Sequence, residues 1–566
     1  MFKQKQELLL LLVLMIAAPG NAKKTSPIYK YQSILSQEPF NQVILFMLAT
    51  EYLKSNFTEE AIVEYKKILN RNPQNTKALF NLGVAYIKWN NDVETAYDCF
   101  QKVLEISPTH TKAMAQIAHI LEKQKKLSKA ITTYKKIIQI TPNNANAYKI
   151  VGTLLKKQEL CQEAIPYLTK ASELAPQDRM LLFTLGNTYL MMGEAEKAIQ
   201  EFKKILAYDP RSYVAKHNIG YALKSAGLVN EAIKYYKEAT EINPAYEASI
   251  YAMALAHLYK GDFKEGWKQY EWRLKKEKRN AEKLRQWIKK NNVRGKKIYL
   301  LPEGGIGDTI QFFRYVEVLQ QMGADLIISV QKPLIPLLSN CPYIDRKLLC
   351  SKRDHVPLSY QDMASIMSLP AIFESEEKDI PINIPYIFPD KKLIEKWCHY
   401  FENNKNFKIG ICWEADVKND VSRLPVARRS IPLAKLQRLA ALPHVQFYSL
   451  QKSSGASQVE NLPQHFVVQT FGPNFDGKSG PFMDTAAIMT QLDLILTVDT
   501  SIAHLAGALG RPVWVMLPLN TDWRWIVNRK TSPWYPTMKV FKQEKPFDWD
   551  GVVMNIFEEL ENILNE

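Results

Sequence analysis

One apolar pattern recurs about every 34 residues through the front half of the chain. Within each unit, apolar and small residues follow the three- and four-residue spacing of a helix face, and a proline closes the unit. The closing prolines stand at positions 73, 108, 142, 176, 210 and 244, which gives spacings of 35, 34, 34, 34 and 34 residues. Proline has no backbone N–H and clashes with the preceding turn, so it ends a helix. The pattern therefore predicts about seven helix pairs over residues 41–274.

The same positions of each unit carry residues of the same size. In the fifth unit they are Leu182, Leu185, Gly186, Tyr189, Ala198, Phe202 and Pro210. Small residues let the two helices approach closely, while bulky ones fill the space between units. The period and this skeleton resemble the tetratricopeptide repeat. The resemblance implies an α solenoid whose groove binds a protein or peptide, although the sequence does not identify the groove residues.

After position 296 the pattern changes to short apolar runs that alternate with helical stretches. Such alternation is typical of a parallel sheet covered by helices. The segment 378–389, rich in Pro and Ile, separates two lobes, which we place at 296–389 and 390–566. Expected strands are 297–301, 324–330, 408–413, 445–450, 466–469, 494–498 and 512–517. Expected helices are 309–322, 334–338, 393–400, 433–442, 485–492, 502–509 and 552–564.

Two loops about 190 residues apart have the same organisation. One is Pro302-Glu-Gly-Gly-Ile-Gly-Asp-Thr309, after the apolar run 298–301; the other is Asp499-Thr-Ser-Ile-Ala-His504, after the run 494–498. Each is predicted to join the end of a buried strand to the start of a helix. Backbone N–H groups at a helix start bind phosphate, and ligands of parallel sheets lie beyond the carboxyl ends of the strands. The two loops therefore predict two nucleotide-fold lobes that face one cleft.

These motifs resemble the heptosyltransferase-like glycosyltransferases (family 9). Segment 303–311 with Arg314-Tyr315 is similar to that family's first loop, and segment 499–512 to its donor loop. Gly266-Trp-Lys-Gln-Tyr-Glu-Trp-Arg273, Asp522-Trp-Arg-Trp525 and Ser532-Pro-Trp-Tyr-Pro-Thr-Met538 are similar to marks of bacterial proteins that fuse such a module to tetratricopeptide repeats. The resemblance implies a GT-B fold of two Rossmann-like lobes. It also implies metal-independent transfer of a sugar from a nucleoside-diphosphate-sugar to a hydroxyl of a protein or glycan, without a further cofactor.

Asp308 is the residue that the resemblance assigns as the general base. A carboxylate beside a helix start can accept the proton of an acceptor hydroxyl. The alternative is a capping role, because Asp commonly binds the free N–H groups at a helix start. The neighbouring first-loop residues on the acceptor side are Gly304, Gly305, Gly307, Thr309 and Gln311.

The resemblance places the donor among residues of the second lobe. Thr500 and Ser501 would hold the diphosphate, with Asp499 and His504 beside them. The cation for the leaving group is left open between Arg429, Arg428 and Lys452, since the loop 414–427 departs from the family's pattern. Further candidates for the nucleotide base or the acceptor are Asp522 and Arg524 with Trp523 and Trp525, whose alternative role is packing. The pair Asp548 and Asp550 has the spacing of a metal-binding motif of another fold, but we expect it to cap the last helix, so no metal site is predicted.

The N-terminus carries a different signal. Lys3 and Lys5 precede the apolar run 8–18, and small residues follow to Ala22. This resembles a signal peptide over residues 1–22, with a buried first helix as the alternative. The signal favours export or membrane contact, whereas sugar nucleotides are cytoplasmic, so the localisation is left open.

Composition narrows the classes of function that the chain could have. The net charge of +16 is spread along the chain, which favours a solvated surface over nucleic-acid binding, and its densest part is a basic linker at 275–295. The six cysteines include no paired CxxC motif, which argues against structural zinc. Two competitors to the enzyme stay open: an inactive repeat scaffold for protein–protein interaction, and a secreted binding protein.

Overall fold

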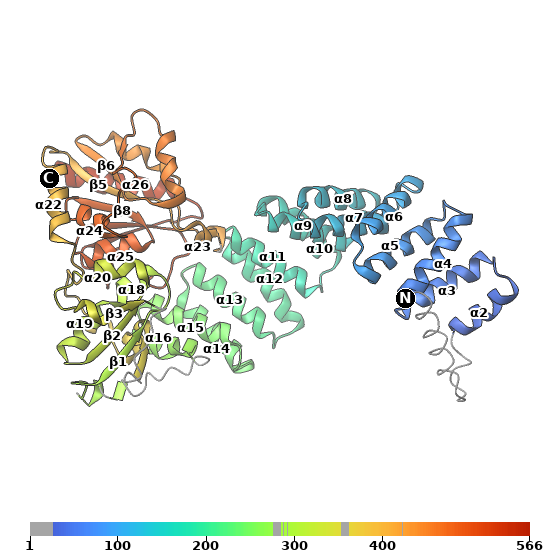
Figure 1. Ribbon diagram of the computed structural model, residues 1–566, viewed down its shortest axis with the longest axis horizontal. Coiled ribbons are helices and arrows are strands. Elements are labelled where there is room, and N and C mark those ends of the chain that lie inside the picture. Colours follow the sequence, from blue (N-terminus) through green and yellow to red (C-terminus); the bar gives the residue numbers. More distant parts are fainter. Residues whose placement is uncertain (1–26, 275–284, 287, 291, 352–361, 422) are drawn as a thin grey trace. The chain divides into compact units, whose positions relative to one another are not determined.

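The computed structural model describes residues 27–274, 285–286, 288–290, 292–351, 362–421 and 423–566 (Figure 1). The chain divides into two compact units, Met1–Leu181 and Leu182–Glu566. The segment predicted as a signal peptide and most of the predicted basic linker lie outside the described residues. Among the helices of the described ranges, none is both long enough and apolar enough to span a membrane.

The front of the described chain is a succession of helices, as the repeat pattern predicts. In all six units that close on a proline, the second helix ends two residues before it, as α12 does before Pro210. The helices are α2 (Pro27–Gln37), α3 (Gln42–Lys54), α4 (Thr58–Arg71), α5 (Thr76–Asn90), α6 (Val93–Ile106), α7 (Thr111–Lys123), α8 (Leu127–Ile140), α9 (Ala145–Lys157), α10 (Cys161–Leu174), α11 (Arg179–Met191), α12 (Ala195–Tyr208), α13 (Tyr213–Ser225), α14 (Val229–Ile242), α15 (Glu247–Lys260) and α16 (Phe263–Tyr270), followed by the 3₁₀ turn η1 (Glu271–Leu274). The helix α2 was not predicted.

Glycines let the two helices of one repeat pack closely. At four of these glycines, an added Cβ would lie only 2.5–2.8 Å from a side chain of the repeat's second helix. Such an approach is shorter than van der Waals contact, so any larger residue would push the helices apart. The pairs are Gly83 with Phe100, Gly152 with Leu168, Gly186 with Phe202 and Gly220 with Tyr236.

The remainder of the second unit contains two parallel sheets. The first has the order β3-β2-β1-β4, and the second β10-β9-β8-β5-β6-β7. The strand order reverses between β1 and β4 and between β5 and β8, and a crevice forms where it reverses. The strands are β1 (Lys297–Leu301), β2 (Asp325–Val330), β3 (Leu349–Ser351), β4 (Asp362–Ser365), β5 (Phe407–Cys412), β6 (Val445–Ser449), β7 (Val468–Gln469), β8 (Leu494–Val498), β9 (Val513–Leu517) and β10 (Met538–Lys542).

Two of the predicted helices of this part, and three of its strands, differ from the prediction. The helix expected at 309–322 is two helices, α18 (Ile306–Phe312) and α19 (Arg314–Gln321), which meet at Phe313. The break was not predicted because the apolar period of the sequence continues unchanged through it. The segment expected as an α-helix at 433–442 is a 3₁₀ helix, η7 (Leu433–Ala441). The strands β3, β4 and β10 were not predicted, since β3 and β4 are very short and two of the five residues of β10 are lysines. The other helices include α22 (Lys391–Phe401), α23 (Val417–Val421), α24 (Met483–Met489), α25 (Ser501–Ala508) and α26 (Trp549–Asn565).

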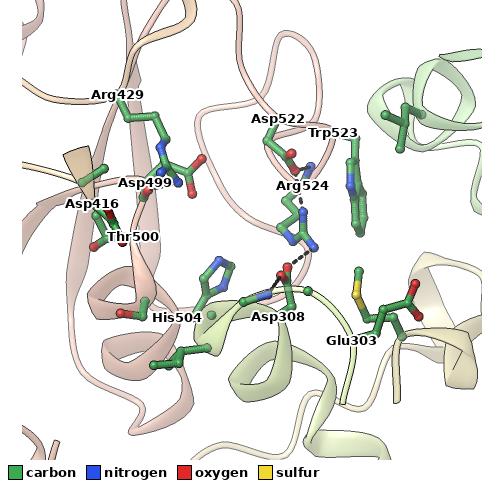
Figure 2. Close-up of a pocket in the computed structure, with 18 of the residues that line it drawn as sticks. Glu303, Asp308, Asp416, Arg429, Asp499, Thr500, His504, Asp522, Trp523 and Arg524 are labelled. Carbon is green, nitrogen blue, oxygen red and sulfur yellow. Dashed lines mark hydrogen bonds and ion pairs between the residues drawn. The ribbon is translucent and has the colours of Figure 1, made fainter. Parts of the chain in front are cut away.

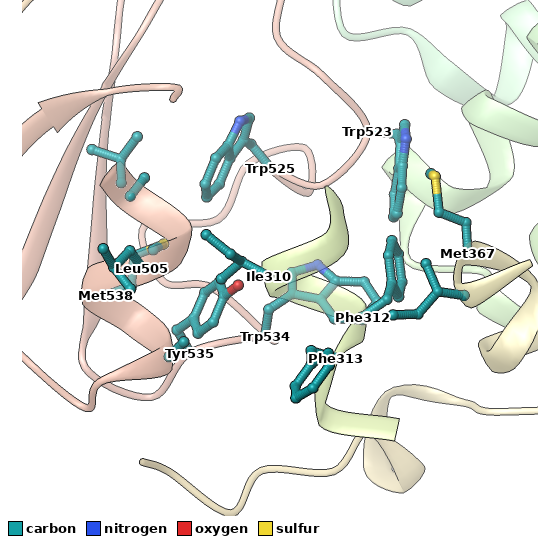
Figure 3. Packing of buried hydrophobic residues seen from close by; sticks show 14 of the residues in the cluster. Ile310, Phe312, Phe313, Met367, Leu505, Trp523, Trp525, Trp534, Tyr535 and Met538 are labelled. Carbon is teal, nitrogen blue, oxygen red and sulfur yellow. The ribbon is translucent and has the colours of Figure 1, made fainter. Parts of the chain in front are cut away.

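A single hydrophobic core joins the last repeats to both sheets (Figure 3). Trp267 of α16 lies edge-on to Phe312 of α18, to Trp523 and to Trp534, with ring centroids 5.2–6.2 Å apart. Buried Arg314 joins the two sheet regions by donating to the Trp534 carbonyl at 2.7 Å. The helices α12–α16 are therefore packed as part of the same unit as the sheets.

Candidate functional site

A cavity of about 750 Å³ lies at the carboxyl ends of β1, β5 and β8 (Figure 2). Three groups of residues line it. The arginine side consists of Asp416, Arg423, Arg429, Asp499, Thr500 and Ser501; the centre holds Asp308, Asp522 and Arg524; and the repeat wall consists of Tyr251, Leu255, Tyr270 and Arg273. The two loops singled out in the sequence therefore meet at one cavity, as the strand order requires.

Asp308 is held in place from two directions. As the third residue of α18, it accepts the Gly305 N–H at 2.5 Å on Oδ2, and it accepts a hydrogen bond from Arg524 on Oδ1. Gly304 has a φ of +69°, and an added Cβ there would lie 2.1 Å from Asp308 Oδ2. Only glycine fits that position. The capping role is thus present, and the carboxylate still faces the cavity.

Arg524 links the central carboxylates. Its Nη1 donates to Asp522 Oδ1 at 2.8 Å, and its Nε donates to Gln311 Oε1 at 2.6 Å. Burial opposes ionisation of Asp522, but the Arg524 guanidinium outweighs it and lowers the pKa of Asp522 below its usual value. Burial also opposes the charge on Arg524, yet Asp308 and Asp522 together raise the pKa of Arg524. The centre is therefore a carboxylate–guanidinium–carboxylate chain, in which Asp522 is ionised and Arg524 is charged.

The start of α25 forms part of the arginine side. Thr500 caps this helix by accepting the Ile502 N–H at 3.3 Å, and Ser501 is its first residue. The preceding Asp499 is buried, and its backbone carbonyl accepts a hydrogen bond from Arg429 Nη1 at 2.8 Å. Burial raises the pKa of the Asp499 carboxyl. The start of α25 and the Arg429 guanidinium thus line the same part of the cavity.

Asp420 orients Arg429. Its carboxylate accepts the backbone N–H of Arg429 at 2.8 Å and the Ser430 hydroxyl at 2.5 Å. The sequence reasoning missed Arg423, which also lines the cavity, because it lies in the loop 414–427 that departs from the family's pattern. Arg428 and Lys452 are not among the residues that line the cavity; the ammonium of Lys452 lies over the Phe475 ring, 4.4 Å from its centroid.

His504 lies at the floor of the cavity, between its two sides. Its Nδ1 is 3.1 Å from the Tyr535 hydroxyl, and its ring stacks on Trp525 at a centroid separation of 5.8 Å. An added Cβ on Gly307 would lie 2.9 Å from its Cδ2, so the two loops touch here. Burial, assisted by the Arg524 charge, lowers the pKa of His504 to about 3. His504 is therefore a neutral imidazole at physiological pH.

Two predicted first-loop residues support the cavity without lining it. Gln311 holds Arg524, as described, and the Thr309 hydroxyl donates to Gln331 Oε1 at 2.8 Å. The repeat wall is absent from the predicted site residues. Its only signal in the sequence is the segment 266–273, which contains Tyr270 and Arg273. Within the described ranges, no group of three or more His, Cys, Asp or Glu side chains is placed to hold a metal ion.

Comparison with known families shows that the front of the chain contains tetratricopeptide repeats. Models of the tetratricopeptide repeat match residues 46–111, 90–154, 157–216 and 213–246. The chain is also similar to Protein FlbA of Caulobacter vibrioides, with 23% identity over 321 residues, 53% of this chain and 52% of FlbA. The chain thus spans about half the length of this curated relative.

Several solved structures resemble part of the chain. YrrB, described as a TPR protein with an unusual peptide-binding site, is 22% identical and covers 33% of this chain and 96% of its own, with a TM-score of 0.31. The C-terminal part of a TPR repeat-containing protein from Cytophaga hutchinsonii is 19% identical over 40% of this chain and 94% of its own, with a TM-score of 0.36. PilF of Pseudomonas aeruginosa is 16% identical over 37% of this chain and 94% of its own, with a TM-score of 0.31.

Proposed function

We propose that the chain is a glycosyltransferase of the GT-B type, which moves a sugar from a nucleoside-diphosphate-sugar to an acceptor hydroxyl. One observation carries the proposal. A single cavity, at the carboxyl ends of strands from two parallel sheets, gathers a carboxylate on the loop after β1, two arginines from the segment after β5 and the helix start after β8. A diphosphate fits the arginine side because guanidinium groups and helix N–H groups both bind phosphate oxygens.

The reaction needs one proton acceptor and stabilisation of one leaving group. The acceptor oxygen attacks the anomeric carbon, and its proton passes to Asp308. The bond from that carbon to the diphosphate oxygen breaks, and its electron pair leaves with the diphosphate. Arg429, Arg423 and the start of α25 stabilise the added negative charge.

Arg524 fixes the direction of Asp308 in this scheme, because the two side chains form an ion pair. A carboxylate offers about four lone-pair sites, and Gly305 and Arg524 occupy two of them. The remaining sites are available to an acceptor hydroxyl.

The proposal is tested by thermal denaturation of the full chain with ADP, UDP, GDP, CMP and their common sugar conjugates. A nucleotide at 100 times its Kd should add about 2.7 kcal/mol to the free energy of unfolding. Stabilisation by one nucleotide family identifies the donor class. A cooperative transition that none of these compounds moves argues against the proposal.

An inactive repeat scaffold is the second candidate. The observation that favours it is that both oxygens of Asp308 are already bound within the protein. The two candidates differ in turnover. An active transferase releases free nucleotide from its donor sugar when an acceptor is present, and it does so slowly without one, when water takes the sugar. Nucleotide binding without any release over hours would favour the scaffold.

A further inference from the structure

The last repeat forms one wall of the proposed transfer site. Tyr251 and Leu255 belong to α15, Tyr270 to α16 and Arg273 to η1, and all four line the cavity that holds Asp308. In Figure 2, Trp523 and Glu303 lie on one side of Asp308, and Asp499, Thr500 and Arg429 lie on the other. Arg273 is hydrogen-bonded to Glu303, and Tyr270 packs against Trp523, so the repeat wall and the arginine side are separate surfaces of one cavity.

The charged group of the repeat wall, the Arg273 guanidinium, is used within the protein. Arg273 donates from Nε and Nη2 to the two oxygens of Glu303, at 2.7 and 2.8 Å. Its other N–H groups donate to Glu271 at 2.6 Å, to the Tyr270 carbonyl at 3.1 Å and to Ser368 at 3.0 Å. These bonds use all five donors of a guanidinium. Arg273 therefore has no hydrogen bond to offer a ligand in this arrangement.

The surface that is left is aromatic and aliphatic. The rings of Tyr251 and Tyr270 stack with centroids 5.8 Å apart and planes 29° apart, and Trp523 packs behind Tyr270. Tyr270 is 3% exposed, whereas Tyr251 is 39% exposed, so Tyr251 presents most of this surface. An apolar or aromatic side chain packs on such a surface without needing a hydrogen-bonding partner.

We propose that the repeat wall is the acceptor subsite and that the acceptor is a polypeptide. A Ser or Thr hydroxyl reaches Asp308, and an apolar or aromatic side chain that flanks it packs on Tyr251 and Leu255. This inference rests on the proposed glycosyltransferase function and names its acceptor class. A polypeptide is favoured because α15 and α16 continue a repeat array whose type supports peptide or protein partners.

The test uses the full chain and a pool of short peptides with a central Ser or Thr and randomised flanking positions. The immobilised protein is saturated with UDP, GDP or ADP, and retained peptides are sequenced by mass spectrometry. We expect apolar and aromatic flanks to be enriched about 3- to 10-fold, the range that one aromatic contact supplies. The enrichment should be lost in Tyr251→Ala and reduced in Leu255→Ser, and it should be kept in Tyr251→Phe.

Tyr208→Ala is the matched control, because Tyr208 is a 53% exposed tyrosine of α12 that does not line the cavity. The inference is overturned if no peptide is retained, if no flank is enriched, or if Tyr251→Ala leaves the enrichment unchanged. It is also overturned if a pool of oligosaccharides binds the protein in place of peptides and that binding is lost in Tyr251→Ala. The nucleotide-dependent shift of the thermal transition separates these results from failure of the proposed function, because Tyr251 does not belong to the arginine side.

Discussion

Two sides of one cavity present opposite chemistry. On the arginine side, Arg423, Arg429 and the start of α25 line the cavity, and one donor of Arg429 is bound to the Asp499 carbonyl. On the repeat wall, Arg273 carries the same charge, but all five of its donors are bound to Glu303, Glu271, Tyr270 and Ser368, and aromatic rings form the surface. An arginine beside a cavity therefore indicates an anion site only where its donors are not all used. The difference also means that substitutions on the two sides should affect different ligands.

The centre, between the two sides, should give the largest effect. Asp308→Asn removes the proton acceptor, so transfer should fall by about 10²–10⁴-fold while nucleotide stabilisation is kept. The assay is release of nucleotide from the donor sugar that stabilises the protein. Asp550→Asn serves as the control, since Asp550 forms a surface ion pair with Lys435 outside the cavity. Equal turnover in the two variants would remove Asp308 from the mechanism.

The arginine side is tested by neighbouring substitutions. Arg429→Ala should weaken nucleotide binding by about 10- to 100-fold, because a hydrogen bond to a charged group contributes about 1.5–3 kcal/mol. Arg428→Ala, the adjacent arginine that does not line the cavity, should leave the nucleotide affinity near that of the wild type. Isothermal titration with the stabilising nucleotide measures both. The assignment of the arginine side fails if the two variants bind alike.

Acid should destabilise the protein through buried His504. The pKa of His504 is lowered by burial to about 3 in the folded state, against about 6.5 in the unfolded chain. Below pH 6.5 the unfolded chain takes up a proton that the folded protein does not. The stabilisation is therefore complete above pH 6.5 and is lost as the pH falls towards 3, by at most about 1.4 kcal/mol per pH unit.

Denaturation midpoints between pH 7.5 and 4.5 measure this slope, and His504→Asn should flatten it. His217 provides a comparison away from the cavity, since burial lowers its pKa to about 4 and Ser249 lies 3.0 Å from its Nδ1. His217→Asn should flatten the slope to a similar or smaller degree. A slope that neither variant changes would show that other groups govern the acid response.

The repeats were the most predictable part of the fold. Their signal is local, because proline ends a helix and a small residue permits a close helix pair wherever they occur. Strands β1, β8 and β9 were also expected nearly to the residue, since each is a continuous apolar run. Strands β3 and β4 were not predicted because three or four residues are too few to show an alternation of apolar and polar positions. The 3₁₀ helix η7 was mistaken for an α-helix because a short apolar face fits both kinds of helix.

The sequence by itself determined the repeat period, the two loops and the polar groups that they carry, since each of these depends on residues that are neighbours in the chain. Only the tertiary structure decided which of these groups share a cavity. It brought in Arg423 and the repeat wall, left Arg428 and Lys452 outside, and paired Asp308 with Arg524 across 216 positions of the sequence. Such choices depend on how the core around Trp267 packs α16 against both sheets, because no local pattern records which distant side chains will meet.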